Sequence, residues 1–183
     1  MLTSCEDNGS FIMYYVANPL AQGVGKAPAK PKHCIGYAKS NTILGPYKPQ
    51  DHPFICSYGG IGTGSIDANL FMDNGNHCVV YKNGSSFDPE HRSRIYLQQV
   101  KSDGVTTVGS PVDLINSISK GDNDAEGPAL VKNPDNGGYA LFFNAGSYKK
   151  PDTTSNMLRH RTSKARISVK VPSCRLELIR ESR

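Results

Sequence analysis

The stretch SIDANLFMDNGNHCVVYKN, residues 65–83, places an Asn74-Gly75 pair between two largely apolar runs. An Asn-Gly pair is the strongest short-range signal for a β-hairpin, because both central residues of the tight turn must adopt positive φ. The stretch therefore predicts two antiparallel strands joined by a tight turn.

This hairpin pattern occurs three times along the chain. Asn8 begins one copy, before the run FIMYYVA, and Asn136 begins another, before YALFFNA, so successive copies lie 66 and 62 residues apart. Each of the first two hairpins is followed by further predicted strands, HCIGYAKS at residues 33–40 and RIYLQQVKS at 94–102. Four short strands in each repeat of roughly 64 residues are typical of the blades of a β-propeller. The sequence therefore predicts an all-β propeller with little helix.

The length allows only part of a propeller. The chain has 183 residues, fewer than three such repeats, whereas closed propellers need about four to eight blades. We expect a partial propeller domain of about three blades at residues 1–150, with blades at about 1–50, 51–112 and 113–150. An irregular, basic tail is expected at residues 151–183.

Positive charge is concentrated in this tail. The whole chain has a net charge of +5, but Met1 to Tyr148 carry 11 basic and 13 acidic residues, and the last 35 residues carry 10 basic and 3 acidic ones. The basic residues of the tail are scattered, and no aromatic residue follows Tyr148 to stack on bases. We therefore expect no nucleic-acid partner.

Membrane and targeting signals are also absent from the sequence. No segment approaches the ~20 consecutive apolar residues of a transmembrane helix. The first ten residues, MLTSCEDNGS, contain no basic segment followed by an apolar run. We expect no membrane association and no signal peptide in this chain.

The cysteines, histidines and glycines show no metal or cofactor motif. The five cysteines lie at least 22 residues apart, and the five histidines form no H-x-H or H-E-x-x-H arrangement. The glycine-rich residues 59–65 fit neither the dinucleotide fingerprint nor the Walker A spacing. Cys34 and Cys78 lie in apolar runs, as small buried hydrophobic residues do, and the disulfide state stays open. We expect no metal and no cofactor.

Two acidic residues begin the predicted inner strands of successive blades. Asp67 lies in GTGSIDANLF and Glu126 in DAEGPALVK, and we expect them to occupy equivalent positions. Because inner strands line the central channel of a propeller, both carboxylates are expected at one end of that channel. The alternative is that Asp67 only caps a turn and that Glu126 only precedes a Gly-Pro turn.

The order and spacing of several segments resemble consecutive blades of glycoside hydrolase family 43. These segments lie within about residues 8–148 and read FIMYYVANP with HCIGYAKSNTILGPYKP, GTGSIDANLFMDNGNHCVVYKNG, IYLQQVKSDGVTTVGSPVDLI and EGPALVKNPDNGGYALFFNAGSY. The family consists of five-bladed propellers that act on arabinan and xylan. The chain looks closest to arabinanases and arabinofuranosidases.

The resemblance implies an inverting hydrolase with three acidic residues. Glu126 matches the general acid, and Asp67 matches the residue that modulates the pKa of the acid and orients it. It also implies an arabinan- or xylan-type oligosaccharide substrate, no cofactor and an extracellular location. The general-base Asp of the first blade has no match here, and Ala68 replaces the usual proline after Asp67.

These departures lead us to expect a fragment that lacks the first and last blades and has impaired glycosidase activity. One alternative is a non-catalytic, carbohydrate-binding propeller remnant, although the chain has no Trp to stack on sugars. Another is a propeller scaffold for protein partners. The sequence leaves open the sugar, its linkage, exo or endo action and the oligomeric state.

Overall fold

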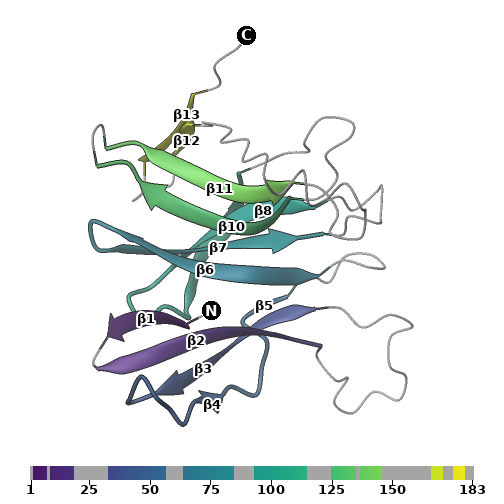
Figure 1. Cartoon of the computed structure of the whole chain (residues 1–183), viewed down its shortest axis with the longest axis vertical. Helices are drawn as coiled ribbons and strands as arrows, with labels where there is room; N and C mark the ends of the chain where they lie inside the picture. Colours follow the sequence, from purple (N-terminus) through teal and green to yellow (C-terminus); the bar gives the residue numbers. More distant parts are fainter. Residues whose placement is uncertain are drawn as a thin grey trace.

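All regular elements of the described residues are β-strands (Figure 1). The computed structural model describes residues 2–7, 9–18, 33–56, 64–84, 93–114, 125–134, 137–145, 166–170 and 175–179. Every strand pair in this part of the chain is antiparallel. None of these residues belongs to a helix that is long and apolar enough to cross a membrane.

Each of the three sheets is built from consecutive strands of the chain. The first contains, in order, β1 (Leu2–Asp7), β2 (Ser10–Ala17), β3 (Cys34–Ser40) and β4 (Lys48–Pro49), with β5 (Ile55–Cys56) also paired to β3. The second contains β6 (Ser65–Asp73), β7 (Asn76–Asn83), β8 (Arg94–Val100) and β9 (Thr107–Asp113). The third contains β10 (Ala125–Lys132), β11 (Tyr139–Ala145), β12 (Arg166–Lys170) and β13 (Arg175–Ile179).

The three predicted hairpins are confirmed. They join β1 to β2, β6 to β7 and β10 to β11. In the central turn Asn74 and Gly75 have φ of 49° and 77°, and Gly9 and Gly137 have φ of 74° and 68°. The asparagines of the two outer turns lie outside the described residues. Positive φ at these positions explains why Asn-Gly was informative in this sequence.

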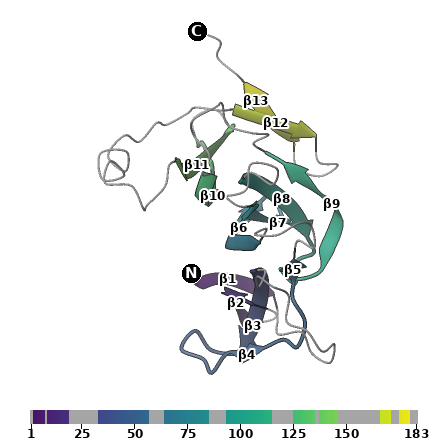
Figure 2. The same ribbon diagram turned by 90° about the vertical axis from the view of Figure 1, so that its right-hand side faces the viewer.

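The sheets are stacked, with the second sheet between the other two (Figures 1 and 2). Alternate residues of a strand point to opposite faces, and both faces of β7 are buried. Val79 and Tyr81 pack toward the first sheet, whereas Cys78 and Val80 pack toward the third. This double burial accounts for the nearly continuous apolar run in β7.

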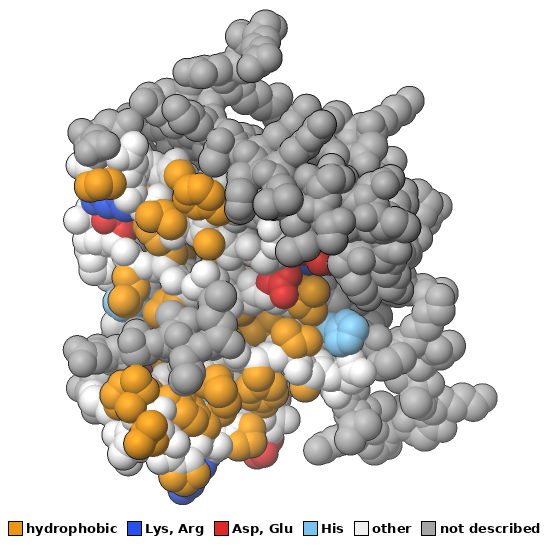
Figure 3. All heavy atoms as spheres, in the orientation of Figure 1, with side chains coloured by type: hydrophobic (Ala, Val, Ile, Leu, Met, Phe, Trp, Pro, Cys, Tyr) orange, Lys and Arg blue, Asp and Glu red, His pale blue; other side chains and the backbone are white. Residues whose placement is uncertain are grey.

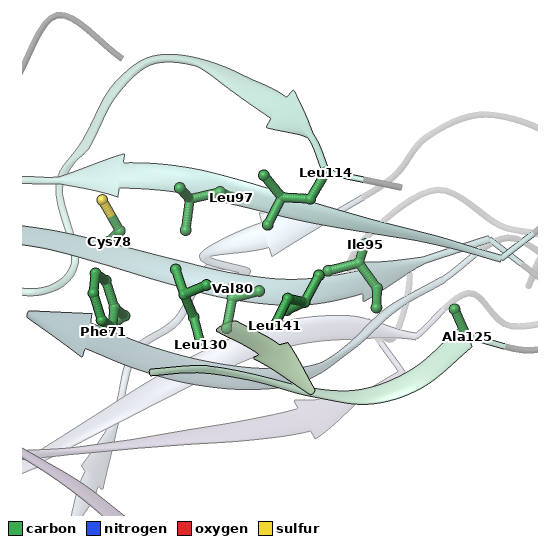
Figure 4. Packing of buried hydrophobic residues seen from close by; sticks show 9 residues of the cluster. All are labelled: Phe71, Cys78, Val80, Ile95, Leu97, Leu114, Ala125, Leu130 and Leu141. Atoms are coloured by element: carbon green, nitrogen blue, oxygen red, sulfur yellow. The ribbon is translucent and has the colours of Figure 1, made fainter. Parts of the chain in front are cut away.

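Two hydrophobic clusters therefore hold the sheets together. Between the first and second sheets, the buried residues are Ile12, Tyr14, Ile35, Val79, Tyr81 and Val100. Between the second and third sheets, they are Phe71, Cys78, Val80, Ile95, Leu97, Leu114, Ala125, Leu130 and Leu141 (Figure 4). The strand β6 contacts both neighbouring sheets, through β2 and β10.

The tail contains two strands that the sequence analysis did not predict. Strands β12 and β13 extend the third sheet, and the pairing of Ala140 with Arg166 joins them to β11. The runs RISVK at 166–170 and RLELI at 175–179 alternate largely between polar and apolar residues, which is a strand pattern.

A disulfide links Cys34 to Cys56. The two residues are direct partners in the pairing of β3 with β5, so β5 belongs to the first sheet although it lies within the predicted second blade. Cys78 is buried between the second and third sheets, as expected for a small hydrophobic residue.

Candidate active site

The strand β6 contains a bulge at its start. Its pairing with β7 runs from Ile66, opposite Lys82, to Asn69, opposite Val80, so Asp67 and its successor together face one residue of β7. Such bulges change the direction of a side chain and often lie beside active sites. Because of the bulge, the side chain of Asp67 does not follow the regular alternation of side chains between the two faces of β6.

The strand β10 contains a matching bulge. Its pairing with β11 runs from Glu126, opposite Asn144, to Ala129, opposite Phe142, so Gly127 and its successor face one residue of β11. In both strands the two bulge residues are the third and fourth of the strand. Adjacent sheets thus present the same backbone irregularity at the same end.

Matching the two bulges corrects one prediction. By register, Glu126 corresponds to Ile66, and Asp67 corresponds to Gly127, so the two acidic residues are offset by one position. Asp67 and Gly127 have nearly equal φ, 57° and 58°. For a residue with a side chain this conformation costs roughly 1–2 kcal/mol, and such strain is commonly found at functional sites.

Asp67 contacts the backbone of the neighbouring sheet. The N–H of Gly127 donates a hydrogen bond to Oδ2 of Asp67 at 2.9 Å. A Cβ on residue 127 would lie 3.2 Å from the side-chain nitrogen Nδ2 of Asn144. The residue also has positive φ, so glycine suits this position. The structure therefore brings Asp67 next to the peptide that follows Glu126, although the two residues come from different sheets.

The side chain of Glu126 is held by a lysine that the sequence analysis missed. Lys82 Nζ donates a hydrogen bond to Glu126 Oε1 and forms an ion pair with it. The side chain of Lys82 is 5% exposed and that of Glu126 is 34% exposed. The alternation Cys78, Val80, Lys82 along β7 was visible in the sequence, and it places Lys82 on the face that packs against the third sheet.

Two buried polar atoms lie at the same end of β6 and β7, on residues adjacent in sequence to the pair of Ile66 with Lys82. Ser65 and Asn83 are paired in register, and they directly flank that pair, at which the bulge begins. Within the described part of the chain, Ser65 Oγ and Asn83 Oδ1 are buried and have no hydrogen-bond partner. Such atoms are costly unless a ligand or water satisfies them. The backbone N–H of Ser65 donates to the carbonyl oxygen of His33 at 2.9 Å, which ties this edge to the first sheet.

A second ion pair joins the same two sheets at the opposite end of the strands. Lys132 Nζ lies 2.6 Å from Asp73 Oδ1, and the hydroxyl of Tyr139 donates to Asp73 Oδ2. Burial raises the pKa of Asp73, but the hydrogen bonds from Lys132 and Tyr139 outweigh burial, so the pKa is lowered overall. At about 3.3 Å per residue, Asp73 lies roughly 20 Å along β6 from Asp67.

Figure 3 shows acidic side chains toward the left and the right of the middle of the molecule, with hydrophobic side chains between them.

Among the described residues, no group of three or more His, Cys, Asp or Glu side chains is placed to hold a metal ion. The carboxyl group of Glu126 is thus bound by the buried ammonium group of Lys82, and the peptide that follows Glu126 is bound by the carboxylate of Asp67. Such a group can move a proton at a fixed position.

Comparisons with known proteins agree with this fold. Residues 4–170 match the family model described as glycosyl hydrolases family 43. The crystal structure of a thermostable family-43 glycoside hydrolase is 28% identical, with a TM-score of 0.61, and the match covers 82% of this chain and 46% of that one. No curated protein matches the chain.

Two more distant structures share the fold. An endo-1,4-beta-xylanase from Bacteroides thetaiotaomicron is 22% identical with a TM-score of 0.54, and the match covers 82% of this chain and 45% of that one. An alpha-L-arabinofuranosidase from Lactobacillus brevis is 17% identical with a TM-score of 0.57, and the match covers 80% and 44%. The chain thus spans less than half the length of these three structures. The three stacked sheets and these matches confirm the predicted all-β, partial propeller.

Proposed function

Because the chain belongs to glycosyl hydrolase family 43, we propose that it takes part in hydrolysis of O-glycosidic bonds in arabinose- or xylose-containing polysaccharides. Glu126 is the general acid, and Asp67 orients it. The observation that carries this proposal is the hydrogen bond from Gly127 N to Asp67 Oδ2, 2.9 Å long, because it fixes the backbone beside Glu126 from the neighbouring sheet.

The proposed reaction is a single displacement with inversion. The carboxyl O–H of Glu126 gives its proton to the glycosidic oxygen while the bond from that oxygen to C1 breaks. A water oxygen forms a bond to C1 from the opposite face and loses a proton to a general base. The products are the free sugar and the released alcohol, and in inverting enzymes the acid and base stand ~6.5–9.5 Å apart.

The proposal assigns only the acid side of this reaction to residues 1–183. No acidic residue among them matches the general base of the family's first blade. Since general acid or base participation typically contributes about 10²- to 10⁴-fold in rate, this polypeptide on its own is expected to turn over slowly.

The substrate class and location are parts of the same proposal. An arabinan- or xylan-type oligosaccharide is supported by family membership and by the structural likeness to an arabinofuranosidase and a xylanase. An extracellular location is supported by the Cys34–Cys56 disulfide, because disulfides persist mainly in oxidising compartments.

A second candidate is carbohydrate binding without catalysis. It is favoured by the lack of a residue that matches the general base among residues 1–183. Calorimetric titration with arabino- and xylo-oligosaccharides, combined with product analysis, separates the two. Product release that stops in Glu126→Gln supports hydrolysis, whereas binding with no product in either protein supports the second candidate.

A further inference from the structure

The ammonium group of Lys82 occupies an unusual place in the core. Lys82 follows Cys78 and Val80 on the face of β7 that packs against the third sheet, and its side chain is only 5% exposed. A buried charge is unfavourable unless it is paired and hydrogen-bonded. Its described partner is Glu126, the residue proposed as the acid.

This ion pair is poorly explained by stability alone. Replacing a buried ion pair with apolar residues of similar size is often neutral or stabilising, because both charges must be removed from water. The surroundings of Lys82 are suited to such a replacement, since Val80, Ile95 and Leu141 belong to the adjoining apolar cluster. Since stability alone does not explain a buried ammonium group at this position, its contact with the proposed acid favours a functional role.

The chemistry of the two side chains indicates what that role is. A lysine ammonium only donates hydrogen bonds, so Oε1 of Glu126, which accepts from Lys82, cannot carry the acidic proton at the same time. The proton of the carboxyl form therefore resides on Oε2. Asp67 holds the following peptide through Gly127 N, so both contacts that fix this glutamate come from the second sheet.

We propose that Lys82 is a positioning residue for Glu126, which fixes the orientation of the carboxyl group and directs its proton to Oε2. This inference rests on the proposed function. Lys82 does not contact the substrate in this account and acts only through Glu126.

The test compares substrates that differ in their need for an acid. Aryl arabinofuranosides and aryl xylosides are prepared with 2,4-dinitrophenol, which leaves without protonation, and with 4-methoxyphenol, which needs a proton. Sodium azide is added to supply a nucleophile: its nitrogen forms a bond to C1 as the C1–O bond breaks, and the aryl oxygen leaves with the electron pair. Dinitrophenol leaves as the phenolate, whereas 4-methoxyphenol takes the proton of Glu126 as it leaves. The proteins compared are the full chain, Lys82→Met, Glu126→Gln and, as a matched control, Lys132→Met, whose lysine pairs with Asp73 between the same two sheets.

If Lys82 positions the acid, Lys82→Met lowers kcat for the 4-methoxyphenyl substrate by about 10²-fold. Its kcat for the dinitrophenyl substrate and both KM values stay within a few-fold of the unmodified chain. Lys132→Met leaves the ratio of the two rates unchanged. The urea midpoint of Lys82→Met is lower than that of the unmodified chain, because removal of one partner leaves Glu126 without its counter-ion, so the rates are compared in the absence of urea, where both proteins are folded.

Equal losses on both substrates, or no loss, overturn the role of Lys82 while the proposed function stands, provided that turnover depends on Glu126. Turnover that does not respond to Glu126→Gln, or its complete absence, overturns the proposed function and this inference with it. Should Lys82→Met fail to fold, Lys82→Gln replaces the ammonium group with a shorter, uncharged side chain. A loss confined to the 4-methoxyphenyl substrate then supports the role of Lys82, and equal losses or no loss overturn it.

Discussion

The backbone N–H of Gly127 donates a hydrogen bond to Oδ2 of Asp67, 2.9 Å away, and both residues lie in bulges with nearly equal φ. Two adjacent sheets are therefore joined at the residue that follows Glu126. A hydrogen bond to a carboxylate contributes roughly 1.5–3 kcal/mol at most, which is comparable with the roughly 1–2 kcal/mol that positive φ costs at Asp67.

The strain at Asp67 gives the first prediction. Asp67→Ala and Asp67→Gly both remove the hydrogen bond to Gly127, but only glycine adopts φ of 57° without steric cost. We expect Asp67→Gly to be more stable than Asp67→Ala by about 1 kcal/mol, measured by urea unfolding. Equal stability of the two variants would show that the backbone at Asp67 is unstrained.

The disulfide gives the second. Cys34 and Cys56 are separated by 22 residues, and closing a loop of this length stabilises a protein by about 3 kcal/mol through the unfolded state. We expect the double variant Cys34→Ser, Cys56→Ser to lose this amount in urea unfolding. A reducing agent should lower the Tm of the unmodified chain and leave that of the double variant unchanged, and any other pattern contradicts a stabilising disulfide.

The third concerns acid stability. The pKa of Asp73 is lowered in the folded chain by hydrogen bonds from Lys132 and Tyr139 that outweigh burial. A lowered carboxyl pKa adds stability above the unfolded value near 3.8, and this stability is lost as the pH falls through the folded value. Asp73→Asn should therefore be less stable than the unmodified chain at pH 7, and the difference should shrink as the pH falls below 3.8. A difference that stays constant as the pH falls below 3.8 contradicts this assignment.

The fourth tests the central position of the second sheet. Leu97 is 2% exposed in the cluster between the second and third sheets, whereas Leu44 is 95% exposed. We expect Leu97→Ala to lower the free energy of unfolding by about 2–5 kcal/mol. The same truncation at Leu44 should change it by less than about 0.5 kcal/mol. Similar losses at both positions would mean that this cluster is not the core.

Local sequence patterns were sufficient for the hairpins and the fold class, because Asn-Gly turns and short apolar runs act within a few residues. Family membership was also predicted from the order of these segments and is confirmed. The offset between Asp67 and Glu126 was not predicted, because each bulge adds a residue whose effect appears only in the pairing register.

Other features required contacts between distant parts of the chain. The pairing of Cys34 with Cys56 follows from the register of β3 with β5, which spacing alone does not give. Lys82 could have been placed on a buried face by the alternation of β7, but its contact with Glu126 depends on the packing of two sheets. The strands at 166–170 and 175–179 were predictable from their alternation of polar and apolar residues, although the tail is basic.

The assignment of Glu126 as the general acid is tested most directly by the rates at which Glu126→Gln releases 4-methoxyphenol and 2,4-dinitrophenol in the presence of azide. Glutamine keeps an oxygen that can accept from Lys82, so the contact between the sheets is preserved while the acidic proton is lost. We expect a loss of about 10²- to 10⁴-fold in the rate for 4-methoxyphenol and little change for 2,4-dinitrophenol. An equal effect on both leaving groups would contradict the assignment of Glu126 as the acid.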